Sequence, residues 1–144
     1  MYACSAAMAG SIAARAALES GGTASGSRNV TGQLIGVERV GFSRVTFWRR
    51  DFADQSLGAL MNTLAGSSDS LLLPESVMQE QALRIGDRVQ VIVTLEDGHA
   101  SIPFRVAGTF RLWPGWYPDP EDDRAGSLFV GNLDYIWDMA GFQL

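Results

Sequence analysis

Residues 83–110, LRIGDRVQVIVTLEDGHASIPFRVAGTF, carry the clearest secondary-structure pattern of the sequence. Valines recur at every second position over 88–95, which is the two-residue period of a β-strand. Asp97-Gly98 follows and favours a type I′ hairpin turn, because both residues tolerate left-handed backbone conformations. Apolar residues alternate again over 100–110. The stretch therefore predicts an antiparallel hairpin whose first strand is apolar on both faces, as in a central strand, and whose second strand has Ile102, Phe104 and Val106 on one face.

Helices and strands mix around this hairpin. Ser56 can cap a helix whose apolar residues recur every three to four positions, and Pro74 can start a second, short helix. The remaining expected elements are strands at 33–38, 71–73 and 127–130, a short helix within 41–52, and an amphipathic helix at 133–139. We therefore expect an α+β fold, a mixed or antiparallel sheet with short helices packed on it.

The chain divides into two regions of different composition. Residues 3–18 are rich in alanine and predict a helix that ends at Gly21-Gly22, and residues 20–32 are rich in glycine and serine, as in a flexible linker. Residues 1–32 are thus expected to form an Ala-rich segment and a linker. Residues 33–144 are expected to form a single α+β domain.

Size and charge narrow the function. The chain has 144 residues, enough for one domain with its own core, and a net charge of −5. Its arginines are scattered, whereas a protein that binds a phosphate backbone needs a basic patch, so we expect no nucleic-acid partner. The single cysteine, Cys4, provides neither an internal disulfide nor a cysteine-based zinc site. We expect no metal and no cofactor.

Few side chains suit catalysis. His99 is the only histidine and follows the hairpin turn, where a histidine is usually solvated. The acidic run at 119–123 lacks the ligand spacing of a calcium-binding loop. We therefore predict no catalytic residue and expect that the chain is not an enzyme. A hydrolase that uses the carboxylates of 119–123 is a further hypothesis.

Aromatic residues are the candidate contact sites. Trp113, Trp116 and Tyr117 lie among prolines in one loop, and such stiff apolar surfaces often contact a substrate or a partner. Packing of these rings against the sheet is the alternative. Trp48, beside two arginines, is a second candidate contact, for which core packing is the favoured alternative.

Several segments, taken in order over about residues 33–142, resemble the large extracytoplasmic domain of FtsX-like ABC-transporter permeases, the group that includes MacB-type transporters. These segments are LIGV at 34–37, FWRRDF at 47–52, LGALMN at 57–62, LLPE at 72–75, LRIGDRV at 83–89, FRVAGT at 104–109, WPGWYP at 113–118 and LFVGNLDY at 128–135.

The resemblance implies a domain with the MacB-like periplasmic core architecture, on the extracytoplasmic side of the cell membrane. Its partners would be the other domains and transmembrane helices of the same permease and, indirectly, a cytoplasmic ATPase subunit. It would bind a peptide, lipid or lipoprotein substrate, or a partner, and couple mechanically to export. The alternative is a stand-alone soluble β-barrel-like binding module, which the Gly86-Asp87 strand entry and the hairpin favour.

Overall fold

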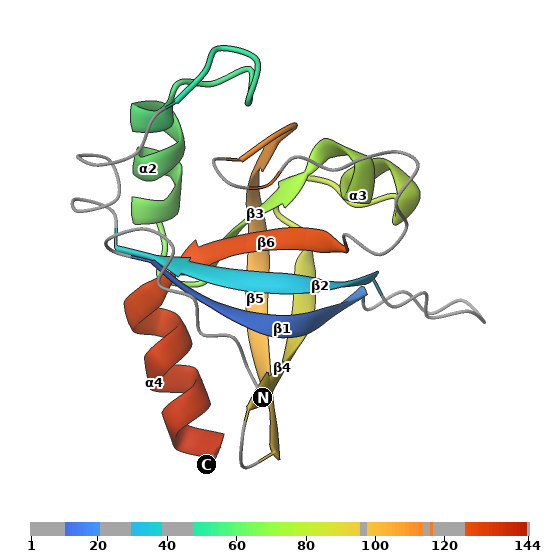
Figure 1. Cartoon of the computed structure of the whole chain (residues 1–144), viewed down its shortest axis with the longest axis vertical. Coiled ribbons are helices and arrows are strands. Elements are labelled where there is room, and N and C mark those ends of the chain that lie inside the picture. Colours follow the sequence, from blue (N-terminus) through green and yellow to red (C-terminus); the bar gives the residue numbers. More distant parts are fainter. Residues whose placement is uncertain are drawn as a thin grey trace.

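The protein is a small closed β-barrel. The computed structural model describes residues 11–20, 30–38, 48–95, 98–113, 116 and 126–143. Within these residues the strands close in the order β1-β2-β6-β3-β5-β4 (Figure 1). The strands are β1 (Ser11–Ser20), β2 (Val30–Val37), β3 (Ser70–Pro74), β4 (Arg88–Leu95), β5 (Gly98–Phe110) and β6 (Ser127–Asn132).

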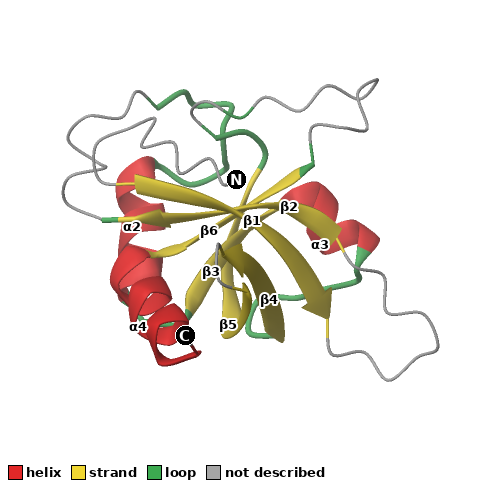
Figure 2. Ribbon diagram, turned by 60° about the horizontal axis from the view of Figure 1, so that its bottom comes forward, coloured by secondary structure: helices red, strands yellow, loops and turns green. Residues whose placement is uncertain are grey.

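Three helices of the described part accompany the barrel. They are α2 (Leu57–Ala65), α3 (Glu75–Glu80) and α4 (Leu133–Gln143). Helices α2 and α4 lie on one side of the barrel and α3 lies on the other (Figure 1, Figure 2). None of the described helices combines the length and the apolarity that a membrane span requires.

The closed barrel corrects the predicted fold class. The α+β arrangement with helices packed on a sheet, and with it the MacB-like periplasmic core architecture, is wrong. The reason lies in β1, where an Ala-rich helix was predicted. Because β1 pairs antiparallel with both β2 and β4, it joins the two ends of the sheet. Alanine favours helices, but the neighbouring strands override this weak propensity.

The predicted hairpin is confirmed. Strands β4 and β5 pair antiparallel, and residues 96 and 97 connect Leu95 to its partner Gly98. Inward-facing side chains of β5 are buried at every second position from Ala100 to Phe110. The barrel also contains parallel pairs, β2 with β6 and β3 with β5, which the sequence does not predict.

Most of the other expected elements are present. Ser56 caps α2, because its Oγ accepts a hydrogen bond from the Ala59 N–H at 3.1 Å. Strand β3 is buried along its whole length, and Pro74 sits at the N-cap of α3. The predicted helix within 41–52 falls largely outside the described residues, as do Cys4, the acidic run at 119–123 and most of the linker.

Two hydrophobic clusters stabilise the barrel. The larger one fills its interior, and the smaller one lies between the barrel wall, α2 and the segment that precedes α2. The buried members of the interior cluster are Ala16, Leu18, Leu34, Leu71, Leu73, Val77, Val89, Val91, Val93, Ile102, Phe104, Val106 and Phe129. One residue of β1, Leu18, is fully buried there, so this strand contributes to the core of the barrel.

The amide of Asn132 ties β6 to the C-terminal end of α2. Its Nδ2 donates to the carbonyl oxygens of Leu64, Ser67 and Ser68 at 2.9, 3.1 and 3.2 Å. Carbonyls at a helix C-terminus lack partners within the helix, so this side chain satisfies groups that would otherwise be unpaired.

Asn132→Asp should therefore lower the free energy of unfolding by about 2 kcal/mol or more, because an isosteric donor becomes an anionic acceptor facing three carbonyls. The carboxylate is disfavoured in the folded state, so its pKa rises on folding. The loss due to charge is then full at neutral pH, shrinks as the pH falls through the raised pKa of the folded state, and is absent below about pH 4, where the carboxyl is protonated in both states. Urea denaturation at several pH values measures this. Asn62→Asp, on the exposed face of α2, is the control and should cost only about 0.5 kcal/mol.

Candidate functional site

An aromatic cluster lies at the end of β5 beside α2. Trp48 packs edge-on against Phe52 and Trp113, with ring centroids 5.1 and 5.4 Å apart. Phe110 packs against Trp113 at 5.2 Å and against Trp116 at 5.9 Å. Such contacts add to the stabilisation from burial, so the cluster fastens the segment before α2 to the barrel wall.

Three of the four predicted contact residues belong to this cluster. Trp113 is 1% exposed, so its ring is a packing element and offers no surface to a partner. Trp48 and Trp116 are half-buried in the same cluster. The indole N–H of Trp116 is buried and has no hydrogen-bond partner among the described residues. Tyr117 lies outside the described residues.

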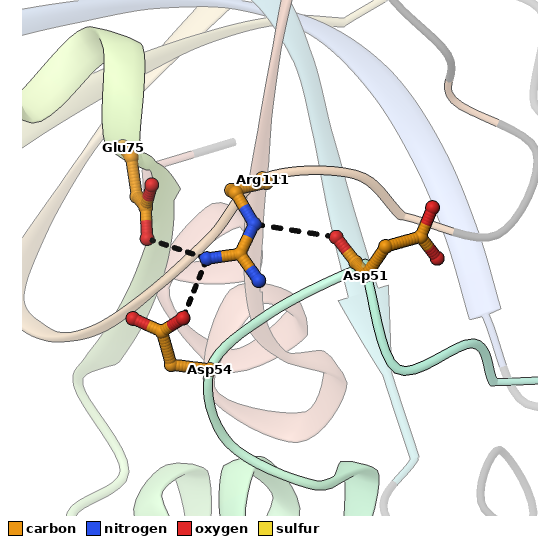
Figure 3. A network of polar contacts seen from close by, with 4 residues as sticks. All are labelled: Asp51, Asp54, Glu75 and Arg111. Atoms are coloured by element: carbon orange, nitrogen blue, oxygen red, sulfur yellow. Dashed lines mark hydrogen bonds and ion pairs between the residues drawn. The ribbon is translucent and has the colours of Figure 1, made fainter.

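Arg111 reinforces this packing with a polar network (Figure 3). Its guanidinium contacts the Asp54 and Glu75 carboxylates at 2.5 and 3.5 Å and donates from Nε to the Asp51 carbonyl at 3.3 Å. The hydrogen bond that Arg111 donates to Asp54 raises the pKa of Arg111 above its ordinary value, with smaller contributions from the charges of Asp54, Glu75 and Asp51. The network links segment 51–54 to the end of β5 and to α3, and the guanidinium of Arg111 is already engaged by two carboxylates.

Two arginines lie next to each other on the β4–β5 hairpin. Arg88 and Arg105 are directly opposite each other across the two strands. Their inward neighbours Val89 and Phe104 are buried, so both arginines point outward, and both are exposed. Like charges at such a pair destabilise a sheet, because opposite Cβ atoms lie only about 5 Å apart.

No carboxylate in the described part of the chain pairs with either arginine. The ion pairs found there are Arg49 with Asp51 and the two that Arg111 makes. The nearby carboxylates are engaged by neutral groups. Asp69 accepts a short hydrogen bond from the Ser67 hydroxyl, and Asp87 accepts one from the Arg84 backbone N–H at 2.9 Å.

The two arginines line an open cavity of about 430 Å³. Its other polar lining residues are Asp69, Gln90 and Tyr135. The Tyr135 hydroxyl donates to the Pro103 carbonyl at 2.5 Å, and its ring packs edge-on against Phe104. Partial burial, followed by the charge of Asp69, raises the pKa of Tyr135, so the phenol is neutral at physiological pH. It forms a fixed wall and adds no negative charge.

Gln90 supplies further donors to the cavity. Its Oε1 accepts a hydrogen bond from the Ser101 hydroxyl at 2.8 Å, which leaves the two N–H groups of the amide for a ligand. The cavity thus combines two guanidinium groups and an amide with one carboxylate, that of Asp69. This donor set matches the oxygens of a carboxylate or a phosphate, which arginine binds with two parallel hydrogen bonds.

The sequence alone does not identify Arg88 or Arg105 as site residues. Each occupies an outward position of a predicted strand, but only the register shows that they are opposite each other.

His99 is exposed at the far end of the hairpin, with its Nδ1 3.5 Å from the Thr94 hydroxyl. Across the described ranges, no three His, Cys, Asp or Glu side chains gather into a metal-binding group.

No protein-family model matches the chain, and no curated protein matches it.

Proposed function

We propose that this chain is a small β-barrel binding module that recognises a carboxylate or phosphate group at the Arg88–Arg105 pair. The main support is that these two arginines lie directly opposite each other without a carboxylate partner in the described residues. This arrangement costs stability in the free protein. An anion in the cavity would offset the repulsion between the two guanidinium groups and accept hydrogen bonds from them. Its binding would therefore relieve an unfavourable interaction of the free protein.

The net charge of the protein limits the kind of anion that this arginine pair can bind. The protein has a net charge of −5, so its surface as a whole repels anions. Binding at Arg88 and Arg105 must then depend on short-range contacts, which favours a small anionic group over a long polyanion. The neutral Tyr135 and the amide of Gln90 suit this role because they add no negative charge, so the two guanidinium groups outweigh the one carboxylate of the lining, that of Asp69.

The test is an NMR titration of the whole chain with inorganic phosphate and with succinate. We expect shifts of the amide signals at Arg88, Arg105 and their strand neighbours, and no response to the uncharged succinamide. The double variant Arg88→Gln, Arg105→Gln should bind at least about tenfold more weakly.

The matched control is Arg50→Gln combined with Arg84→Gln, which removes two exposed arginines that do not line the cavity. If the control loses as much affinity as the site variant, the effect comes from net charge and the proposed site is wrong. If neither anion shifts the amides of the hairpin, the chain has no anion site there.

The permease interpretation stays a prediction from the sequence. A binding module of this kind is compatible with a place in an FtsX-like transporter, on the extracytoplasmic side. Fractionation of the native cells, followed by protease added outside spheroplasts, tests it. A membrane-integral band that the protease removes supports the permease, and a cytoplasmic band contradicts it.

A further inference from the structure

The outer surface formed by β4, β5, β1 and the start of β2 is a continuous exposed face, which we call the open face. The β1–β4 register pairs Ala16 with Val93, so Arg15 stands beside Thr94. The outward side chains form four rows across the strands: Gln33, Arg15, Thr94 and His99; Thr31, Ala17, Ile92 and Ser101; Glu19, Gln90 and Pro103; and Arg88 with Arg105. All are exposed except Ala17, Glu19 and Ile92, which are half-buried.

The open face has a basic group at each end. Arg88 and Arg105 form one end. At the other end Arg15, Thr94 and His99 line a groove of about 610 Å³. No carboxylate in the described residues pairs with Arg15. The ends are six residues apart along β4, which corresponds to about 20 Å.

The middle of the open face differs from its ends. Ala17 and Ile92 supply a small apolar area there, and Glu19 stands opposite Gln90. Glu19 is the acidic side chain in these rows, and it repels a negative charge that lies across the centre. The face therefore favours a ligand that is acidic at both ends and neutral or basic between them.

Recognition on this face must use side chains. Strand β4, along which such a ligand would lie, pairs with β5 over its whole length and with β1 over Val89–Val93, so most of its backbone is already engaged. A ligand has to lie across the outside of the sheet and reach the two basic ends with its own side chains. An extended polypeptide rises about 3.3 Å per residue, so acidic residues about six positions apart match the spacing of the ends.

We propose that the partner of this module is an extended peptide segment with an acidic residue at each end and a neutral or basic centre, bound along β4 between Arg88/Arg105 and Arg15. This inference rests on the proposed function, since it uses the Arg88–Arg105 pair as one of its two anchors. It adds the second anchor, the length of the ligand and the sign of its centre.

The experiment measures the binding of three synthetic peptides to the full chain. They are a seven-residue peptide with glutamate at both ends and lysine at its centre, the same peptide with one terminal glutamate replaced by glutamine, and an all-glutamate peptide. We expect the two-ended peptide to bind about fivefold more tightly than the one-ended peptide, as for one exposed ion pair. Arg15→Gln should abolish this difference, and Glu19→Gln should improve binding of the all-glutamate peptide.

Thermal melting of both variants checks that they are folded. Equal affinity for the two-ended and one-ended peptides, with phosphate and succinate still bound at Arg88 and Arg105, overturns the inference and leaves the proposed function standing. If the parent protein binds none of the peptides and neither phosphate nor succinate, the proposed function is overturned as well. A single-stranded oligonucleotide that binds as tightly as the two-ended peptide also overturns the inference. Such a ligand is negative along its whole length, so Glu19 should repel its centre and weaken its binding.

Discussion

Trp113→Ala is expected to lower the free energy of unfolding by about 3–5 kcal/mol, because it removes the largest fully buried side chain of the protein's described core. The indole contacts Trp48 and Phe110, so its loss opens a cavity between the barrel wall and the segment that precedes α2. Neighbouring rings cannot fill that space without leaving their own contacts. Urea denaturation followed by tryptophan fluorescence and circular dichroism measures the change.

The matched control for this prediction is Trp137→Ala on α4. Trp137 is 58% exposed, so the same substitution should change the free energy of unfolding by less than about 0.5 kcal/mol. A Trp113→Ala variant that is as stable as the control would contradict the packing role. It would return Trp113 to the set of candidate contact residues, where the sequence had placed it.

The hairpin shows how much of the fold the sequence predicts. Alternation over β4 and β5 is a local signal, and it correctly assigns both strands. The register depends on the turn. A turn centred on Asp97-Gly98 would pair Gln90 with Arg105, whereas the structure pairs Leu95 with Gly98 and brings Arg88 opposite Arg105. The candidate site depends on this shift, so the strands were predictable and the site was not.

Strand β1 shows where local signals fail. Its run of alanines has a high intrinsic helix propensity, and nothing within residues 11–20 indicates a strand. What stabilises it is non-local, namely pairing with β2 on one side and with β4, about seventy-five residues away in the chain, on the other. Because β1 closes the barrel, the error at one segment changed the fold class from a closed barrel to an open sheet.

The predicted contact residues illustrate the same limit. A loop rich in tryptophan and proline indicates a stiff apolar surface, but it does not say whether that surface faces solvent or the protein. Trp113 is buried because Arg111 and Leu112 donate backbone hydrogen bonds to the Phe52 carbonyl, which brings segment 48–54 over the ring. These partners are about sixty residues apart in the chain, and no local pattern links them.

Gly32→Ala is the second substitution with a large expected effect. Gly32 pairs with Ser127 where the parallel strands β2 and β6 begin their contact. A Cβ atom at this position would lie 2.1 Å from the Ser127 carbonyl oxygen, 2.5 Å from its carbon and 2.7 Å from its nitrogen. All three atoms belong to the backbone, so no side chain can rotate to make room. The strands would have to separate, and we expect a loss of more than about 3 kcal/mol.

The closed topology makes this clash harder to relieve than it would be in an open sheet. Strand β2 is held by β1 on its other side and β6 by β3, so a shift at Gly32 disturbs four strands at once. Gly58→Ala in α2 is the control, because the nearest atom to its new Cβ is 4.0 Å away and alanine favours a helix. Urea denaturation should leave the control as stable as the parent or slightly more so. A Gly32→Ala variant that matched it would show that β2 and β6 do not approach each other this closely, and the closure of the barrel at that seam would have to be abandoned.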